Sequence, residues 1–244
     1  MNEEEIAIKT QAEQFAKDNK KRLAKELTDI STYAPDESPM SFFMAGSPGA
    51  GKTEYSQNLV KSLEEHKKHR VIRIDADEFR KYIPGYTGKN SYLFQSAIST
   101  IVHTVHDLAL NQKQTFLMDG TLSNYERAAL NINRSLSRNR PVLIFYVYQK
   151  PEVAWKFTEA REVTEGRNIP KDVFIERFLS ARDVIERIRK DFDERVVIFL
   201  VKKNFETHKV ESVIRIEKDG QQIDQHIQER YTKDELEKLL WLAN

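Results

Sequence analysis

The stretch MAGSPGAGKT, residues 44–53, decides how the rest of the chain is interpreted. It contains a Gly-x-x-x-x-Gly-Lys-Thr pattern, and the apolar run Met40 to Ala45 before it predicts a short strand. The residues after it, 52–66, predict a helix. A glycine-rich turn between a strand and a helix exposes backbone N–H groups, and the positive end of the helix dipole faces the same space. The stretch therefore predicts a loop that binds phosphate.

Each residue of this loop has an expected part in holding a nucleoside triphosphate. The Lys52 side chain reaches the β- and γ-phosphates, and the Thr53 hydroxyl ligates Mg²⁺. A glycine-rich turn that binds nothing is the alternative interpretation, and the loop alone does not separate a kinase from a GTPase, a motor or an ATPase. The predicted nucleotide-binding residues are Gly46, Ser47, Pro48, Gly49, Ala50, Gly51, Lys52 and Thr53.

Strands and helices alternate along the chain after this loop. Short apolar runs predict strands at 70–74, 115–118, 142–148 and 196–201. Apolar residues at helical spacing predict helices at 92–111, 124–137, 151–163 and 171–190. This alternation is typical of an α/β fold of the P-loop kinase type, in which helices cover both faces of a mainly parallel sheet.

We expect a single P-loop kinase domain over residues 1–244. Its expected parts are an N-terminal helix and linker (1–38), an α/β core (39–204) with a lid near 161–170, and a C-terminal hairpin and helix (205–244). The hairpin is expected to turn about the glycine of 218–220. The final helix is expected to start at Thr232, with a capping box to Glu235.

Composition and charge argue against several other classes of protein. Lys and Arg number 39 against 38 Asp and Glu, and this balance disfavours a dedicated nucleic-acid binder. There is no cysteine, and the six histidines lack the spacing of zinc ligands. No signal peptide and no run of about 20 apolar residues is present, so we expect a cytoplasmic protein with no membrane partner.

Two acids follow the second predicted strand, in Ile74-Asp-Ala-Asp-Glu-Phe-Arg80. Because the carboxyl ends of parallel strands line the ligand crevice, we expect Asp75 and Asp77 beside the γ-phosphate. Asp77 can accept a proton there from an attacking hydroxyl, while Asp75 is expected to cap or orient the loop. The alternative for Asp77 is a helix N-cap. The fourth strand lacks the Asn/Thr-Lys-x-Asp element of guanine-specific GTPases after it, which favours a kinase.

A further acid, Asp119, ends the third strand in Phe116-Leu-Met-Asp-Gly-Thr121. This is a Walker B position, which holds Mg²⁺ through water or contacts the acceptor; a plain turn residue is the alternative. Ser123 and Glu126 form a capping-box pattern, so we interpret Ser123 as structural.

Arg161 and Arg167 stand at a helix end and in the loop after it. They predict a lid whose guanidinium groups neutralise charge on the γ-phosphate and exclude water. Solvated surface arginines are the alternative interpretation.

In combination these motifs resemble the zeta toxin family, the P-loop kinases of toxin–antitoxin systems. The resemblance extends to about residue 220 and rests on GSPGAGKT, IDADEFR followed by IPGY, MDGT and AREVTEGRNIP. It implies a kinase that uses ATP or GTP, with Mg²⁺, to phosphorylate the sugar 3′-hydroxyl of UDP-N-acetylglucosamine and so inhibits growth. It also implies a free antitoxin protein that blocks the ATP site.

The resemblance assigns roles by position. The catalytic residues it implies are Asp77 as the base, with Lys52, Arg161 and Arg167. The substrate-binding residues it implies are Asp119, Thr121 and His103, where His103 takes the place of a glutamate and is otherwise a polar-face histidine. Two other functions stay open: a related kinase for another nucleotide, NAD or a polynucleotide end, and an ATP-binding module without catalysis.

Overall fold

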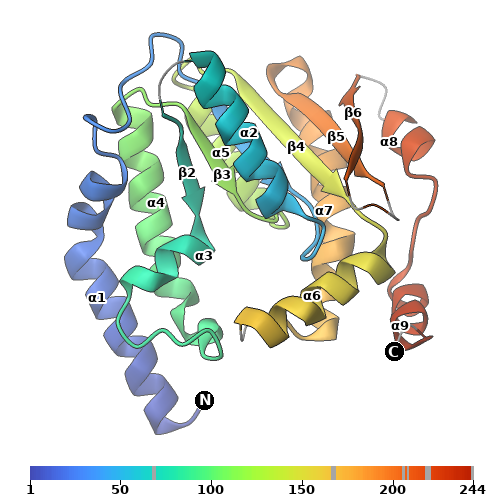
Figure 1. Cartoon of the computed structure of the whole chain (residues 1–244), viewed down its shortest axis with the longest axis horizontal. Helices are drawn as coiled ribbons and strands as arrows, with labels where there is room; N and C mark the ends of the chain where they lie inside the picture. The colour runs from blue at the N-terminus through green and yellow to red at the C-terminus, as the bar shows by residue number, and fades with distance from the viewer. Residues whose placement is uncertain (68–69, 166–168, 205–206, 208, 218–220, 243–244) are drawn as a thin grey trace.

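A six-stranded sheet with the strand order β2-β3-β1-β4-β5-β6 forms the centre of the molecule (Figure 1). This computed structural model describes residues 1–244 apart from 68–69, 166–168, 205–206, 208, 218–220 and 243–244. The strands are β1 (Ser41–Ala45), β2 (Ile72–Asp75), β3 (Phe116–Asp119), β4 (Val142–Tyr148), β5 (Val197–Lys203) and β6 (Val210–Ile216). All neighbouring strands are parallel except β6, which is antiparallel to β5, and the mainly parallel sheet is thereby confirmed.

Helices cover both faces of this sheet, as the alternation predicts. The α-helices are α1 (Glu3–Leu27), α2 (Lys52–Lys67), α3 (Ala76–Phe79), α4 (Gln95–Asn111), α5 (Tyr125–Leu136), α6 (Pro151–Glu165), α7 (Lys171–Phe192), α8 (Gln221–His226) and α9 (Lys233–Leu242). Short 3₁₀ turns are η1 (Arg80–Tyr82), η2 (Ser91–Phe94) and η3 (Asp193–Arg195). Helix α1 lies along α4 at one side of the molecule (Figure 1).

Alternation of side chains along β1 divides the core between the two faces of the sheet. Phe43 and Ala45 belong to the larger core, which α1, α4, α5 and α7 complete. Phe42 and Met44 belong to a second core, which α2 covers through partly buried side chains such as Leu59. The apolar run before the glycine-rich loop is therefore buried on both faces, as expected for a central parallel strand.

The C-terminal hairpin is present, but its strands differ from those expected. Strand β6 pairs with β5, and the segment around Ile223, expected to follow the turn of the hairpin, forms helix α8 instead. β6 pairs with the edge of β5 that β4 leaves free. Ile223, in α8, is buried in the larger core. Helix α9 follows Thr232 with the expected capping box, in which the Thr232 N–H donates to Glu235 at 2.8 Å.

The parallel order brings the ends of β1, β2 and β3 to one edge of the sheet, and two of these ends carry an acid. β1 runs into the glycine-rich loop, and Asp75 at the end of β2 lies directly opposite Asp119 at the end of β3.

In the described part of the chain, no helix is both long and apolar enough to cross a membrane.

Candidate active site

The loop before α2 adopts a shape that requires glycine. Gly46 has φ +138°, and a Cβ atom there would lie 2.3 Å from the carbonyl oxygen of Val147. Gly49 has φ +70°, and its Cβ atom would lie 1.9 Å from the carbonyl oxygen of Ala154. Side chains at these positions are excluded by both backbone conformation and space. The loop thus keeps the backbone-lined cradle that phosphate oxygens need.

A cavity of about 760 Å³ opens beside this loop. The loop, the ends of β2 and β3, and residues of α6 and α7 line it. Its basic lining residues are Lys52, Arg80, Arg127, Arg161, Arg177 and Lys203. Its acidic lining residues are Glu54, Asp75, Asp77 and Asp119. Cations around a glycine cradle suit a polyphosphate, which is the fit expected of a nucleotide site.

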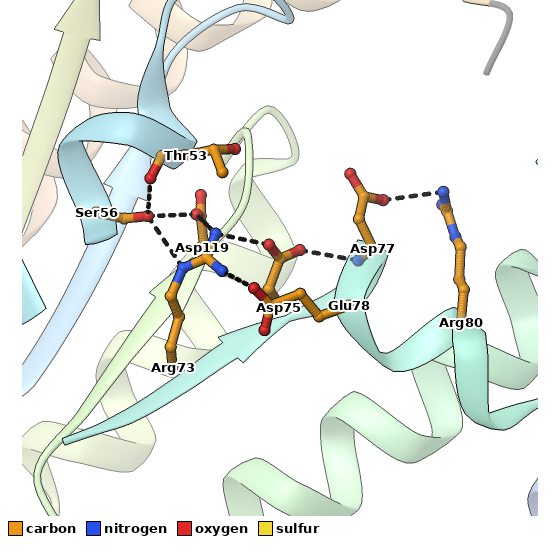
Figure 2. A network of polar contacts seen from close by, with 8 residues as sticks. All are labelled: Thr53, Ser56, Arg73, Asp75, Asp77, Glu78, Arg80 and Asp119. Carbon is orange, nitrogen blue, oxygen red and sulfur yellow. Dashed lines mark hydrogen bonds and ion pairs between the residues drawn. The ribbon is translucent and has the colours of Figure 1, made fainter. Parts of the chain in front are cut away.

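The two acids after β2 divide their tasks. Asp75 is the N-cap of α3, because its Oδ1 accepts the backbone N–H of Asp77 at 2.8 Å. The expectation that Asp75 caps this turn is confirmed, and the N-cap alternative for Asp77 is wrong. The Asp77 side chain lines the cavity, and its Oδ1 lies 2.9 Å from Nη1 of Arg80 (Figure 2).

Asp119 is held by a network that the sequence did not reveal (Figure 2). Its Oδ2 accepts hydrogen bonds from Oγ of Ser56 at 2.6 Å and from Nη2 of Arg73 at 2.5 Å. The same guanidinium donates to Asp75 at 2.7 Å and to Glu78. Arg73 therefore joins the acids at the ends of two neighbouring strands.

The electrostatics of this network explain its pKa shifts. Burial raises the pKa of Asp75 to about 6, helped by the facing Asp119 and opposed by Arg73. Burial also disfavours the charge on Arg73, but the carboxylates of Asp75 and Asp119 outweigh it and raise the pKa of Arg73. A firmly charged guanidinium, that of Arg73, thus lies behind the two cavity-lining acids, whose charges repel one another.

The Asp-Gly-Thr element lies against the glycine-rich loop. The Gly46 N–H donates to the carbonyl oxygen of Thr121 at 3.1 Å, and Thr121 lines the cavity. The capping role expected of Ser123 is wrong: Asn124 is the N-cap of α5, and Ser123 Oγ lies 2.9 Å from Thr121 Oγ1. The helix starts one residue later than that pattern implies.

The structure describes only one of the two arginines expected in the lid. Arg161, on α6, lines the cavity. Arg167 lies outside the described residues, so its role stays a prediction.

His103 does not lie at the cavity. It stands on the exposed side of α4, where 59% of its side chain is exposed and its Nδ1 lies 3.0 Å from Oδ2 of Asp107. The apolar stripe of α4 packs into the core, so its opposite face, which carries His103, points away from the sheet. The structure therefore does not bring His103 to the cavity, and its contact with substrate stays a prediction.

Several residues in or beside the cavity escaped sequence reasoning. Lys203, at the end of β5, is 4% exposed and donates to Glu54 at 2.8 Å beside the loop. Arg73 had a usable signal, because it is a charged residue between Ile72 and Ile74 in an otherwise apolar strand. Arg80 and Lys203 had none, since only packing decides which way their side chains point.

A glycine cradle after the central parallel strand, with a lysine at the helix start and acids at the neighbouring strand ends, defines a P-loop nucleotide-binding protein. The sequence model of the family "Zeta toxin" matches residues 24–220. This chain belongs to the zeta toxin family, which confirms the resemblance seen in its motifs.

Solved structures show the same fold at low sequence identity. A chain from the PezAT toxin–antitoxin system of Streptococcus pneumoniae has a TM-score of 0.66 and 13% identity, covering 94% of this chain and 93% of that chain. A chain of AvrRxo1-ORF1:-ORF2 with ATP has a TM-score of 0.62 and 14% identity, covering 91% and 74%. No curated protein has a significantly similar sequence.

Proposed function

We propose that this protein transfers the γ-phosphoryl group of ATP or GTP to a sugar hydroxyl of a nucleotide sugar, the 3′-hydroxyl of UDP-N-acetylglucosamine, and so arrests growth. The observation that carries the proposal is the shared cavity of Asp77 and the phosphate loop. A hydroxyl between them loses its proton to the Asp77 carboxylate as its oxygen bonds to the γ-phosphorus and the bond to the β-γ bridging oxygen breaks.

The other residues have roles that follow from their positions. Lys52 binds the β- and γ-phosphates once its Nζ leaves the carbonyl oxygen of Ser47, which now lies 2.6 Å away. Arg161 neutralises charge from its position on α6. Thr121 and Asp119 face the acceptor from the end of β3.

Mg²⁺ fits the donors near the loop. The Thr53 hydroxyl and the Asp119 carboxylate both line the cavity and supply the oxygen ligands that Mg²⁺ prefers, with phosphates and water completing its shell. Bound there, the ion offsets negative charge on the phosphates. Asp119 has one oxygen, Oδ1, outside its hydrogen bonds to Ser56 and Arg73.

A kinase for a different acceptor is the second candidate. The family resemblance implies that His103 contacts the nucleotide sugar, but His103 lies outside the cavity. This position favours an acceptor site built from other residues. Another nucleotide, NAD or a polynucleotide end then takes the place of the nucleotide sugar.

We further propose a protein antitoxin that covers the cavity. The PezAT structure comes from a toxin–antitoxin system, and AvrRxo1-ORF1 was solved together with ORF2. We place the activity in the cytoplasm, where ATP and nucleotide sugars are made.

The test is transfer from γ-labelled ATP. The purified protein is incubated with UDP-N-acetylglucosamine, NAD or an oligonucleotide, and the labelled product is identified by its mass. We expect label on the UDP-N-acetylglucosamine sugar and none after Lys52→Ala, which also ends growth arrest. Label on another acceptor supports the second candidate. If no acceptor is labelled, even in a cell extract, the protein is an ATP-binding module without catalysis.

A further inference from the structure

Arg80 is a buried guanidinium whose donors are not all used. It begins η1, directly after α3, and only 2% of the residue is exposed. Its Nη1 lies 2.9 Å from Asp77 Oδ1 as an ion pair. Within the described residues, however, neither Nε nor Nη1 has a hydrogen-bond partner of suitable geometry. A buried arginine left in this state calls for an explanation, because unsatisfied buried donors are costly.

The surroundings of Arg80 point to a ligand rather than to a packing role. Its guanidinium lies 5.8 Å from the centre of the Tyr86 ring and lines the same cavity as the phosphate loop. The planar guanidinium presents its N–H donors in fixed directions along two edges, and such a group suits the oxygens of a phosphate. The cavity holds space for such a group. Among the described residues, Nε has no hydrogen-bond acceptor and Nη1 has only the ion pair with Asp77.

The position of Arg80 relative to Asp77 shows which reactant it meets. Figure 2 shows Asp77 between Arg80 and the cluster formed by Asp75, Asp119 and Thr53. Thr53 belongs to the loop that holds the triphosphate, so Arg80 stands on the far side of the catalytic base from the phosphate donor. An incoming alcohol occupies that side.

We infer that Arg80 binds a phosphate or diphosphate group of the acceptor and so selects for a phosphorylated acceptor. Arg127, on the first turn of α5, lines the same cavity and adds positive charge there. The inference rests on the proposed function and deepens it, because it assigns the recognition of the acceptor's anionic part to a named side chain.

The experiment measures binding without transfer. Protein saturated with a non-hydrolysable ATP analogue is titrated with UDP in a calorimeter, for the wild type, Arg80→Gln, Arg80→Lys and Lys81→Gln. We expect Arg80→Gln to bind UDP at least tenfold more weakly, and Arg80→Lys at least threefold, since an ammonium lacks the planar, fixed donors of a guanidinium. Lys81→Gln removes an exposed charge from the next residue and is expected to match the wild type. Unchanged affinity for the ATP analogue shows that each variant is folded.

Kinetics with UDP-N-acetylglucosamine separate binding from the positioning of Asp77. We expect Arg80→Gln to raise the KM for this acceptor at least tenfold, with a smaller change in kcat. A lower kcat at unchanged KM, equal UDP affinity in the Arg80 variants, or a wild type that does not bind UDP overturns the inference. If Arg80→Gln does not fold, Arg80→Lys decides by the same criteria. Arg80-dependent UDP binding without any transfer to a sugar supports the inference and contradicts the proposed function instead.

Discussion

The carboxylate of Asp75 accepts a hydrogen bond from the backbone N–H of Asp77 at 2.8 Å. This bond makes the buried Asp75 the N-cap of α3 and fixes the direction in which the half-buried Asp77 leaves the backbone. The pair shows why an Asp-x-Asp spacing suits this site. One carboxylate sets the backbone, and the other faces the cavity.

Replacing Asp77 by Asn is expected to remove phosphoryl transfer while keeping ATP binding. Asn has the same shape but does not accept the proton of an attacking hydroxyl, so kcat should fall by about 10²–10⁴-fold. The affinity for ATP, measured by titration in the absence of acceptor, should stay within about twofold. A variant with full turnover contradicts the assignment of Asp77 as the base.

Replacing Asp75 by Asn is expected to change how stability depends on pH. The pKa of Asp75 is about 6 in the folded state against an ordinary value of 3.8. Between these values the folded protein retains a proton that the unfolded chain has lost, so wild-type stability falls as pH rises through this window. As pH rises through this window, the free energy of unfolding of Asp75→Asn should therefore increase relative to that of the wild type, by up to about 3 kcal/mol. Urea unfolding at several pH values measures this difference.

Asp29→Asn is the matched control, because the pKa of Asp29 is shifted in the opposite direction from that of Asp75. Hydrogen bonds from the Ser31 backbone and hydroxyl lower the pKa of Asp29 below 3.8. The stability that this acid adds is present above that value and is lost as pH falls through the folded pKa. A pH-independent difference between Asp75→Asn and the wild type refutes the raised pKa.

Removing the guanidinium of Arg73 is expected to destabilise the fold strongly. Arg73→Met leaves the buried carboxylates of Asp75 and Asp119 without their shared partner, at a cost of about 3–5 kcal/mol. The double variant with Asp119→Asn should recover part of that loss, which a double-mutant cycle in urea unfolding measures. By contrast, Arg22→Met breaks an exposed pair with Glu26 and should cost about 1 kcal/mol or less.

Alanine at Gly49 is expected to disrupt the phosphate loop. The added Cβ atom meets the carbonyl oxygen of Ala154 at 1.9 Å and requires a φ of +70°. We expect a loss of about 1–3 kcal/mol in the free energy of unfolding and no measurable ATP binding. Gly120→Ala is the control for stability, since a Cβ atom there has nothing within 4 Å. Equal stability of the two variants contradicts the close packing of the loop.

Local patterns were sufficient for most of the elements and for the phosphate loop. Apolar runs and helical spacing depend on near neighbours, so β4 was placed at Val142–Tyr148, and the loop was recognised from its glycines and Lys52. The acid pair after β2 was found in the same way. The sequence also predicts that Asp75 is the capping residue of the pair, because an acid at the end of a strand commonly caps the next helix.

Long-range packing decided the rest. Arg80 and Lys203 reach the cavity, and Arg73 reaches the acids that line it, because strand register and the turn after α3 aim their side chains there. His103 lies away from it because its helix turns the opposite face to the sheet. The partner of β6 was decided by the free edge of β5.

The sequence by itself determined that a strand, a glycine cradle and a helix bind phosphate, since those features need only adjacent residues. The tertiary structure decided which charges surround that phosphate. Side chains far apart in the chain, such as Arg73 and Asp119, meet only where neighbouring parallel strands end in register. Burial there sets how strongly their charges interact, because the surrounding protein screens them less than water does.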